Sequence, residues 1–255
     1  MLRTRVIPSL LLKNRGLVKT IKFKDPTYLG DPTNVVKIFN DKEVDELVFL
    51  DISATVERRK PNFKYIAEIA TECFMPFGYG GGIRDLEDVK TILGLGVEKA
   101  IINSYAVENP AFISRAADFA GSQSVVVSID VKKSRLGKYE VYTLSGKRGT
   151  GLDPVGFAVE MERRGAGELL LNSIDRDGTM QGYDIELIKR VAEAVRIPVV
   201  ACGGAGKLQD LADAVKVGGA SAASAGSIFV FQGRHRAVLI SYPSRTDLRE
   251  LFGDS

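Results

Sequence analysis

The stretch MPFGYGGGIRDLEDVKTILGLG at residues 75–96 recurs in altered form as IPVVACGGAGKLQDLADAVKVG at residues 197–218. Each copy reads as a short apolar strand, a glycine-rich turn and an amphipathic helix. When the two copies are aligned, the proline, the glycine pair of the turn and the final glycine coincide. Apolar runs match easily by chance, whereas prolines and glycines at fixed spacing do not. The stretch therefore indicates an internal repeat.

The repeat continues on both sides of this stretch. ELVFLDISAT at 46–55 aligns with ELLLNSIDRD at 168–177, and RVIPSLLLK at 5–13 aligns with SVVVSIDVK at 124–132. Most apolar runs are continuous, as in strands covered on both faces. Strands are predicted at Val6–Leu12, Glu46–Asp51, Met75–Gly80, Lys99–Asn103, Ser124–Asp130, Glu168–Ser173, Pro198–Cys202 and Ala220–Ala225. Helices are predicted at Pro32–Glu43, Asn62–Cys73, Leu86–Leu95, Pro110–Ala120, Pro154–Arg164, Ile185–Val195 and Leu208–Val217, with a last one after Gln232.

Eight strand-then-helix units within 255 residues predict a (β/α)8 barrel built from two (βα)4 halves. A doubly wound open sheet is the alternative, and a count of strands does not exclude it. No linker or second domain is visible in the sequence, so we expect one barrel domain over residues 1–255.

The composition is ordinary for a globular protein, with 45% hydrophobic and 26% charged residues. A net charge of +3 is too small to predict binding to nucleic acid. No apolar run approaches the length of about 20 residues that a membrane span needs, so a membrane is not an expected partner either. Two cysteines, Cys73 and Cys202, fit the reducing cytoplasm, and the single histidine, His235, cannot build a His-rich metal site. We expect a cytoplasmic protein without metal or cofactor.

Both glycine-rich turns have the form of a phosphate-binding turn. Glycine lets the backbone approach a bulky anion, and the helix start that follows offers free N–H groups and a favourable dipole. The residues at equivalent places in the two halves are Gly82 with Asn103 and Ser104, and Gly204 with Gly226 and Ser227. The alternative is that the glycines only permit tight turns. Two symmetric copies favour phosphate binding and predict a ligand with a phosphate at each end.

Carboxylates at the carboxyl ends of barrel strands are the usual acid–base catalysts of this fold. Asp130 ends the fifth predicted strand, and we assign it a functional role. Asp51 ends the second strand, whereas Asp175 and Asp177 follow the sixth and also fit loop-capping turns, which we favour for Asp175. The counterpart of Asp130 in the first half is Leu11, which neither gives nor takes a proton. The sequence therefore argues against a symmetric site with two carboxylates.

Charged residues gather at two further places. The connection from Lys13 to Gly30, which includes Lys19, is long and basic. It predicts either a mobile lid that attracts an anionic substrate or a solvated loop. Four charges start strands and so belong to the opposite end of the barrel: Arg5, Glu46, Lys99 and Glu168. Two cations and two anions can pair in a ring there, and charges at that end usually contribute to stability.

Several stretches place the chain close to a known family. They include DELVFLDISAT, YGGGIRDLEDV, YTLSGKRGTG, RGAGELLLNSIDRDGT and ACGGAGK. In these stretches the chain resembles HisF, the cyclase subunit of imidazole glycerol phosphate synthase, and the resemblance covers nearly the whole length. It implies two phosphate sites for a bisphosphate ribonucleotide. It also implies a HisH-like glutaminase that docks on the bottom face and sends ammonia along the barrel axis.

The resemblance implies roles for single residues as well. The family's phosphate contacts correspond to Gly82, Asn103, Ser104, Asp177, Gly178, Gly204, Gly226 and Ser227. The ring of Arg5, Glu46, Lys99 and Glu168 matches the family's ammonia gate. Asp130 matches one of the family's two catalytic aspartates.

The chain departs from the family at the other catalytic aspartate, where it has Leu11. Its tail at Phe229–Ser244 resembles the WbuZ-type branch, which serves surface polysaccharide (lipopolysaccharide) biosynthesis. We therefore predict that the chain and its glutaminase supply ammonia for acetamidino groups on sugars, with a sugar amidotransferase as a further candidate partner. The alternatives are a cyclase of histidine biosynthesis and a non-catalytic scaffold that activates a glutaminase.

Overall fold

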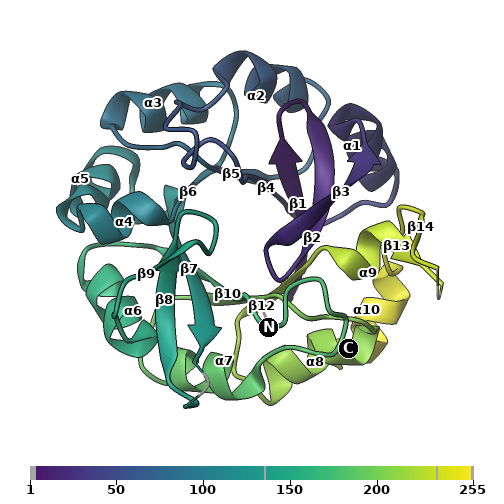
Figure 1. The fold of residues 1–255 in the computed structure, drawn as a ribbon. Helices are drawn as coiled ribbons and strands as arrows, with labels where there is room; N and C mark the ends of the chain where they lie inside the picture. Colours follow the sequence, from purple (N-terminus) through teal and green to yellow (C-terminus); the bar gives the residue numbers. More distant parts are fainter. Residues whose placement is uncertain (1–3, 135, 234, 254–255) are drawn as a thin grey trace.

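Eight parallel strands close into a barrel in the computed structural model, which describes residues 4–134, 136–233 and 235–253 (Figure 1). Each barrel strand pairs with the next, and the pairing of β7 with β10 completes the circle. The barrel strands are β1 (Arg5–Lys13), β4 (Leu47–Asp51), β5 (Phe77–Gly80), β6 (Lys99–Ile102), β7 (Val125–Lys133), β10 (Glu168–Ser173), β11 (Val199–Cys202) and β12 (Ala222–Ala225). The closed circle confirms the predicted (β/α)8 barrel and excludes the open sheet.

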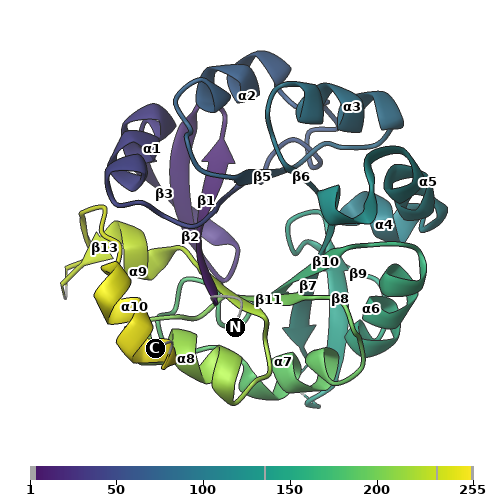
Figure 2. The same ribbon diagram turned by 180° about the vertical axis from the view of Figure 1, so that it is seen from behind.

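Helices cover the outside of the barrel (Figure 2). The longer ones are α1 (Pro32–Asp41), α2 (Phe63–Ala70), α3 (Leu86–Gly94), α5 (Ala111–Ala120), α6 (Pro154–Arg163), α7 (Ile185–Ala192), α8 (Leu208–Lys216) and α10 (Arg245–Phe252). Short helices α4 (Ser104–Glu108) and α9 (Ser227–Val230) follow β6 and β12 at equivalent places in the two halves. All the predicted helices are present, with ends that differ by a few residues. Within the described ranges no helix is long and apolar enough to cross a membrane.

The internal repeat is preserved in the starts of the helices. Asp31 caps α1 and its repeat mate Asp153 caps α6, each by accepting a hydrogen bond from a first-turn N–H. Asn62 and Asp184 cap α2 and α7 in the same paired way. A side-chain cap of this kind contributes about 1 kcal/mol to helix stability. The two halves therefore share the local signals that begin their helices.

Apolar side chains fill both the space under the helices and the interior of the barrel. Alternate residues of each strand point inward. The middle of the interior is occupied by a layer of aliphatic side chains, each at most 4% exposed: Ile7, Val48, Ile101, Val126, Leu170 and Val200. This layer separates the charged residues at the start of the strands from the cavity at their carboxyl ends.

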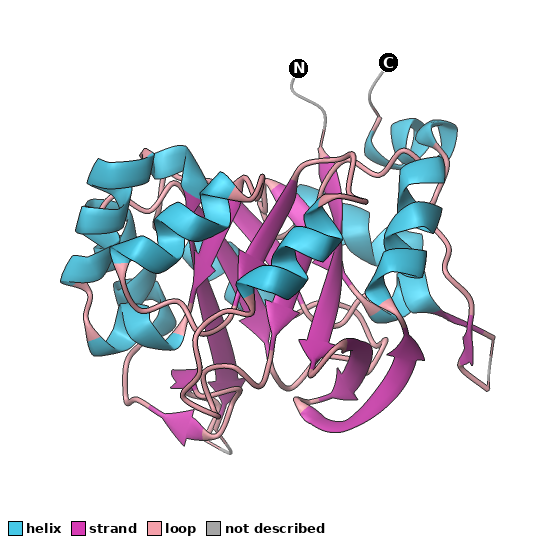
Figure 3. Cartoon of the chain, turned by 90° about the horizontal axis from the view of Figure 1, so that it is seen from above, coloured by secondary structure: helices cyan, strands magenta, loops and turns pink. Residues whose placement is uncertain are grey.

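Two antiparallel hairpins rise at the carboxyl ends of the barrel strands, where the arrows of Figure 3 end. The first follows β1 and consists of β2 (Gly16–Ile21) and β3 (Lys24–Gly30); the second follows β7 and consists of β8 (Tyr139–Thr143) and β9 (Arg148–Gly149). The predicted lid loop from Lys13 to Gly30 is thus wrong, because β2 continues the pairing of β1 and buries most of its residues. A small hairpin, β13 (Phe231–Gln232) and β14 (Ala237–Val238), precedes α10.

Candidate active site

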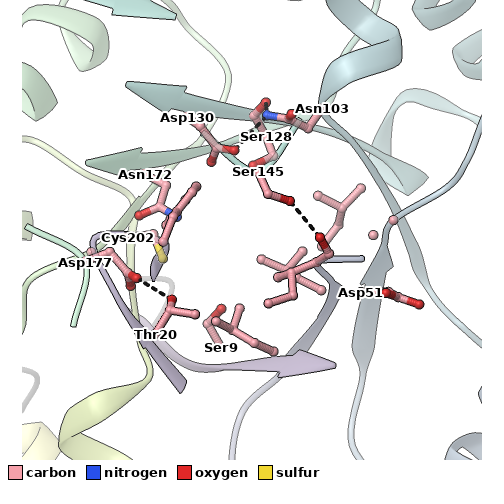
Figure 4. A pocket seen from close by; sticks show the side chains of 18 of the residues that line it. Ser9, Thr20, Asp51, Asn103, Ser128, Asp130, Ser145, Asn172, Asp177 and Cys202 are labelled. Carbon is pink, nitrogen blue, oxygen red and sulfur yellow. Dashed lines mark hydrogen bonds between the residues drawn. The ribbon is translucent and has the colours of Figure 1, made fainter. Parts of the chain in front are cut away.

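The carboxyl ends of the barrel strands surround a cavity, the mouth, to which every barrel strand contributes a lining residue (Figure 4). Polar side chains lie on or directly after β6, β7 and β10: Asn103, Ser128, Asp130 and Asn172. The hairpins also reach the mouth, the first with Lys19, Thr20 and Phe23 and the second with Ser145. No role was predicted for Ser145 or Asn172 from the sequence, although they lie within YTLSGKRGTG and RGAGELLLNSIDRDGT.

Asp130 is buried in the mouth, with 8% of its surface exposed. Asn103 holds it in place, because its Nδ2 donates to Asp130 Oδ2 at 3.2 Å and to Ser128 O at 2.9 Å. Burial, together with the nearby charge of Asp177, raises the pKa of Asp130 from 3.8 to about 7. A carboxyl group that titrates near neutral pH is suited to take and return a proton.

Leu11 lines the mouth from β1, on the side opposite to β7. Its backbone is paired with Leu50 of β4 and Val18 of β2, and Leu50 lines the mouth beside it. Asp51, at the end of β4, does not replace the missing acid. It points away from the centre of the mouth in Figure 4, and Arg59 Nη2 donates to its Oδ2 at 2.8 Å.

The remaining acids after β10 have structural partners. Asp175 accepts a hydrogen bond from Lys133 N at 2.8 Å, which fits the capping role favoured for it. Asp177 forms a buried ion pair with Lys19, with 2.7 Å between Nζ and Oδ1, and Thr20 Oγ1 donates to its other oxygen at 3.1 Å. The first hairpin is therefore docked on the loop that follows β10.

Lys13 and Lys19 were predicted to lie beside a substrate, and the structure separates them. Lys19 is 7% exposed and lies in the mouth, so it is not a solvated loop residue. Lys13 is exposed at the end of β1 and is absent from the lining of the cavity. Gly178 lies in the mouth beside the first hairpin, since a Cβ there would be 2.1 Å from Thr20 O.

The two glycine-rich turns face each other across the mouth. We call each turn, together with the short helix that follows the next strand, a cup. The first cup is the turn of Gly82 with α4, and the second cup is the turn of Gly204 with α9. A Cβ at Gly82 would lie 2.6 Å from Arg59 O, and a Cβ at Gly204 would lie 2.3 Å from Gly182 O. Both glycines also have a positive φ, at +77° and +125°. The turns thus need glycine for their own geometry, whether or not they bind an anion.

A side chain of each following helix occupies N–H groups just before that helix begins. Asp88 accepts from the N–H groups of Arg84 and Asp85 before α3. Asp210 accepts in the same way before α8. These groups precede the first helical residue, so anion binding by the glycine turns and helix starts stays a prediction. The short helices α4 and α9 start at Asn103 and Gly226 without a side-chain cap, so their first N–H groups remain available to a ligand.

At the opposite end of the barrel, the four predicted charges form a closed ring. Arg5 contacts Glu46 at 2.5 Å and also pairs with Glu168. Lys99 Nζ lies 2.7 Å from Glu46 Oε1 and 3.0 Å from Glu168 Oε1. Each carboxylate thus bridges both cations, and the side chains of Glu46 and Glu168 are only 5% and 10% exposed.

Neither cysteine is a candidate nucleophile. Cys202 lies in the mouth, but burial raises the pKa of its thiol to about 12, so it stays protonated. Cys73 lies between α2 and β5, where burial raises its pKa to about 11. His235 is exposed near the tip of the small hairpin and does not line the mouth. Among the described residues no group of His, Cys, Asp and Glu side chains could hold a metal ion.

Comparisons with known proteins give the chain relatives over its whole length. A family model described as "Histidine biosynthesis protein" matches residues 5–236. The "Putative imidazole glycerol phosphate synthase subunit hisF2" of Pseudomonas aeruginosa is 54% identical over 243 residues, which cover 95% of this chain and 97% of the relative. A "Putative imidazole glycerol phosphate synthase subunit HisF" of Leptospira interrogans is 51% identical, with 99% and 100% covered. The "Imidazole glycerol phosphate synthase subunit HisF" of Alkaliphilus metalliredigens is 46% identical, with 90% and 91% covered.

Proposed function

This chain belongs to the histidine biosynthesis protein family as a HisF-like, cyclase-type synthase subunit, and on that premise we propose that its barrel carries ammonia from a glutaminase to a phosphorylated ligand in the mouth. The observation that carries the proposal is the placement of two sites on one axis. A closed ring of charges lies at one end of the barrel, and a polar cavity with a proton-transfer group lies at the other.

The ring is suited to pass a small neutral molecule. Buried charges such as those of Glu46 and Glu168 are unfavourable unless they are paired, and here each of the four charges has two partners. Above the ring lies the aliphatic layer that includes Ile7, Val48 and Val126. A cation would lose its hydration there without compensation, whereas neutral ammonia would lose much less. The proposed gate therefore admits ammonia and holds back ammonium.

The proposed glutaminase, a HisH-like subunit, docks at the end of the barrel that carries the ring. Two large aromatic side chains are exposed there, in or beside the connections that lead into β5 and β7. Phe74 is 83% exposed and Phe119 is 50% exposed. We propose that the partner covers both side chains. A partner seated on them would deliver ammonia directly to the ring.

At the mouth, the proposed ligand carries a phosphate at each end, held by the two cups, and Asp130 transfers the proton. The chemistry differs from that of a two-aspartate cyclase because Leu11 stands at the second position. We propose that the ammonia is used to form acetamidino groups on sugars of surface polysaccharide, in the manner of the WbuZ-type branch. The observation that favours this acceptor is Leu11, which lines the mouth where a two-aspartate cyclase has its second carboxylate.

Cyclisation of the bisphosphate ribonucleotide in histidine biosynthesis is the second candidate. The family match and the names of the relatives favour it at least as strongly. In that case Asp130 performs both proton transfers, with the intact cups and Lys19 holding the substrate. A scaffold that only activates a glutaminase is the third candidate, and it needs no chemistry at Asp130.

Two assays separate the three candidates, and the first measures cyclisation. Purified chain is incubated with the bisphosphate ribonucleotide and an ammonium salt, and formation of the imidazole product is followed. We expect turnover far below that of a cyclase that carries both aspartates, and a large gain in the variant Leu11→Asp. Turnover near that of such a cyclase would contradict the sugar proposal and establish the histidine-pathway activity. Glutaminase activation that survives Asp130→Asn, without amidation of any acceptor, would leave only the scaffold.

A further inference from the structure

We infer that the two cups are unequal and that a phosphate docks first in the cup of the second half, beside Ser227. The inference rests on the proposed function, because it concerns the order in which the two ends of the proposed ligand bind. It starts from two serines, Ser104 and Ser227, that begin the short helices α4 and α9. They are 6% and 4% exposed, and both line the mouth.

The hydroxyl group of Ser104 is already used by the protein. Its oxygen accepts a hydrogen bond from Leu144 N at 3.0 Å, and it donates to Asn103 Oδ1 at 3.1 Å. Leu144 belongs to the turn between β8 and β9. The next residue of this turn, Ser145, donates across the mouth to Ile52 O at 2.7 Å (Figure 4). A phosphate that enters the first cup must displace part of this network.

The hydroxyl group of Ser227 is in the opposite situation. Its oxygen is buried and has no hydrogen-bond partner in the described part of the chain. Native proteins contain few buried polar atoms of this kind, because such an atom loses its hydrogen bonds to water and gains none within the protein. A phosphate oxygen in the second cup would supply the missing acceptor. Binding there therefore satisfies a donor instead of breaking an existing bond.

The glycine turns differ in the same direction. The N–H of Gly82 in the first cup donates to Thr55 Oγ1 at 3.2 Å. The repeat places Asp177 at the position of Thr55, and its carboxylate is turned to the β2–β3 hairpin. No side chain in the described ranges accepts from the N–H of Gly204, so this donor is left for a ligand in the second cup.

Charge does not favour the second cup. Arg84 lines the mouth next to the first glycine turn. Lys19 lies over the second cup, since a Cβ at Gly226 would be 3.0 Å from its Cε, but its charge is already paired with Asp177 at 2.7 Å. The inference therefore rests on the hydrogen bonds, which the free protein makes in the first cup and leaves unmade in the second.

The matched variants Ser227→Ala and Ser104→Ala test it, with inorganic phosphate as the probe. Amide NMR of the isotope-labelled chain follows each cup separately through the resonances of Gly204 and Gly82. We expect the second cup to fill at a lower phosphate concentration than the first. Ser227→Ala should weaken it about tenfold, as the loss of a hydrogen bond to a charged group does. Ser104→Ala should change the affinity of the second cup by less than about twofold.

The outcomes are distinguishable. Equal affinities, a tighter first cup, or a folded Ser227→Ala variant with unchanged affinity would overturn the inference and leave the proposed function standing. If phosphate shifts neither glycine resonance, the cups are only turns, and the two-phosphate ligand fails together with the inference. Thermal unfolding checks the fold of Ser227→Ala, and its midpoint should not fall, because the variant removes an unpaired buried hydroxyl. As a second measurement, Ser145→Ala should strengthen the first cup severalfold, because it releases the turn above it.

Discussion

Asp130 and Leu11 occupy corresponding strands of the two halves, and their surroundings differ as much as their chemistry. Asp130 lies among polar neighbours and accepts a hydrogen bond from Asn103. Leu11 lies beside Leu50, and both line the mouth. The acid–base capacity of the mouth therefore lies on one side of the barrel. The sequence identified Asp130 by its place at a strand end, whereas its raised pKa depends on burial, which only the fold determines.

We expect Asp130→Asn to stabilise the chain more at about pH 8 than at about pH 4. The pKa of Asp130 rises from 3.8 to about 7 on folding, because burial and Asp177 disfavour its ionised form. Asp130 therefore contributes most to the stability of the wild type at pH values below its pKa in the unfolded chain. This contribution to the free energy of unfolding, at most about 4 kcal/mol, is lost as the pH rises from about 4 to about 7. The neutral amide does not titrate, so the variant escapes this loss.

Denaturant unfolding at a series of pH values measures the free energy of unfolding of both proteins. The exposed Asp118 of α5 offers the control variant Asp118→Asn, which should differ from the wild type by a nearly constant amount. If the difference between Asp130→Asn and the wild type were equally constant, Asp130 would titrate like an exposed carboxyl group. Its assignment as the proton-transfer group would then lose its physical basis.

At the scale of elements, the sequence predicted those parts whose pattern is local. Continuous apolar runs located the barrel strands, and amphipathic periodicity located α1, α2, α3, α5, α6, α7 and α8 to within a few residues. The β2–β3 hairpin was missed because its lysines suggest solvent. Lys19 is buried there only because Asp177, 158 residues away in the chain, supplies its counter-charge. The caps by Asp88 and Asp210 were not predicted either, because they depend on side-chain orientation.

The ion pair of Lys19 with Asp177 should hold the first hairpin on the mouth. The two side chains are only 7% and 8% exposed. Lys19→Met leaves a buried carboxylate without its partner, which destabilises by about 3–5 kcal/mol. Amide hydrogen exchange should accelerate at Lys22, whose N–H donates to Asp177 O at 2.9 Å. The control Lys24→Met, on the exposed strand β3 of the same hairpin, should leave this exchange rate unchanged.

A double variant shows whether charge pairing is the cause. Lys19→Met combined with Asp177→Leu removes both charges, so it should be less destabilised than Lys19→Met alone. Equal protection of Lys22 in Lys19→Met and in the wild type would mean that backbone pairing alone docks the hairpin.

At the scale of the whole molecule, the repeat is kept where it builds the barrel and lost in the mouth, where we propose that the ligand binds. Helix caps and the glycine turns recur in both halves, and Glu46 and Glu168 are repeat mates within the ring. In the mouth, by contrast, Thr55 is replaced by Asp177 at the equivalent place, and the two cups differ in their hydrogen bonds. A duplicated scaffold has thus acquired a mouth with two unlike sides, as a ligand with two unlike ends would require.

The ring at the other end leads to a prediction that involves the full complex with a HisH-type glutaminase. Lys99 contacts both carboxylates of the ring, so Lys99→Ala opens one side of it and leaves Arg5 as the only cation between Glu46 and Glu168. Water can then enter, and ammonia can escape before it reaches the mouth. We expect glutamine hydrolysis to continue, while the ratio of glutamine consumed to acceptor amidated rises severalfold. The control is Lys90→Ala on α3, which removes a lysine that is 63% exposed. An unchanged ratio in a Lys99→Ala complex that still assembles would show that the ring only stabilises the barrel.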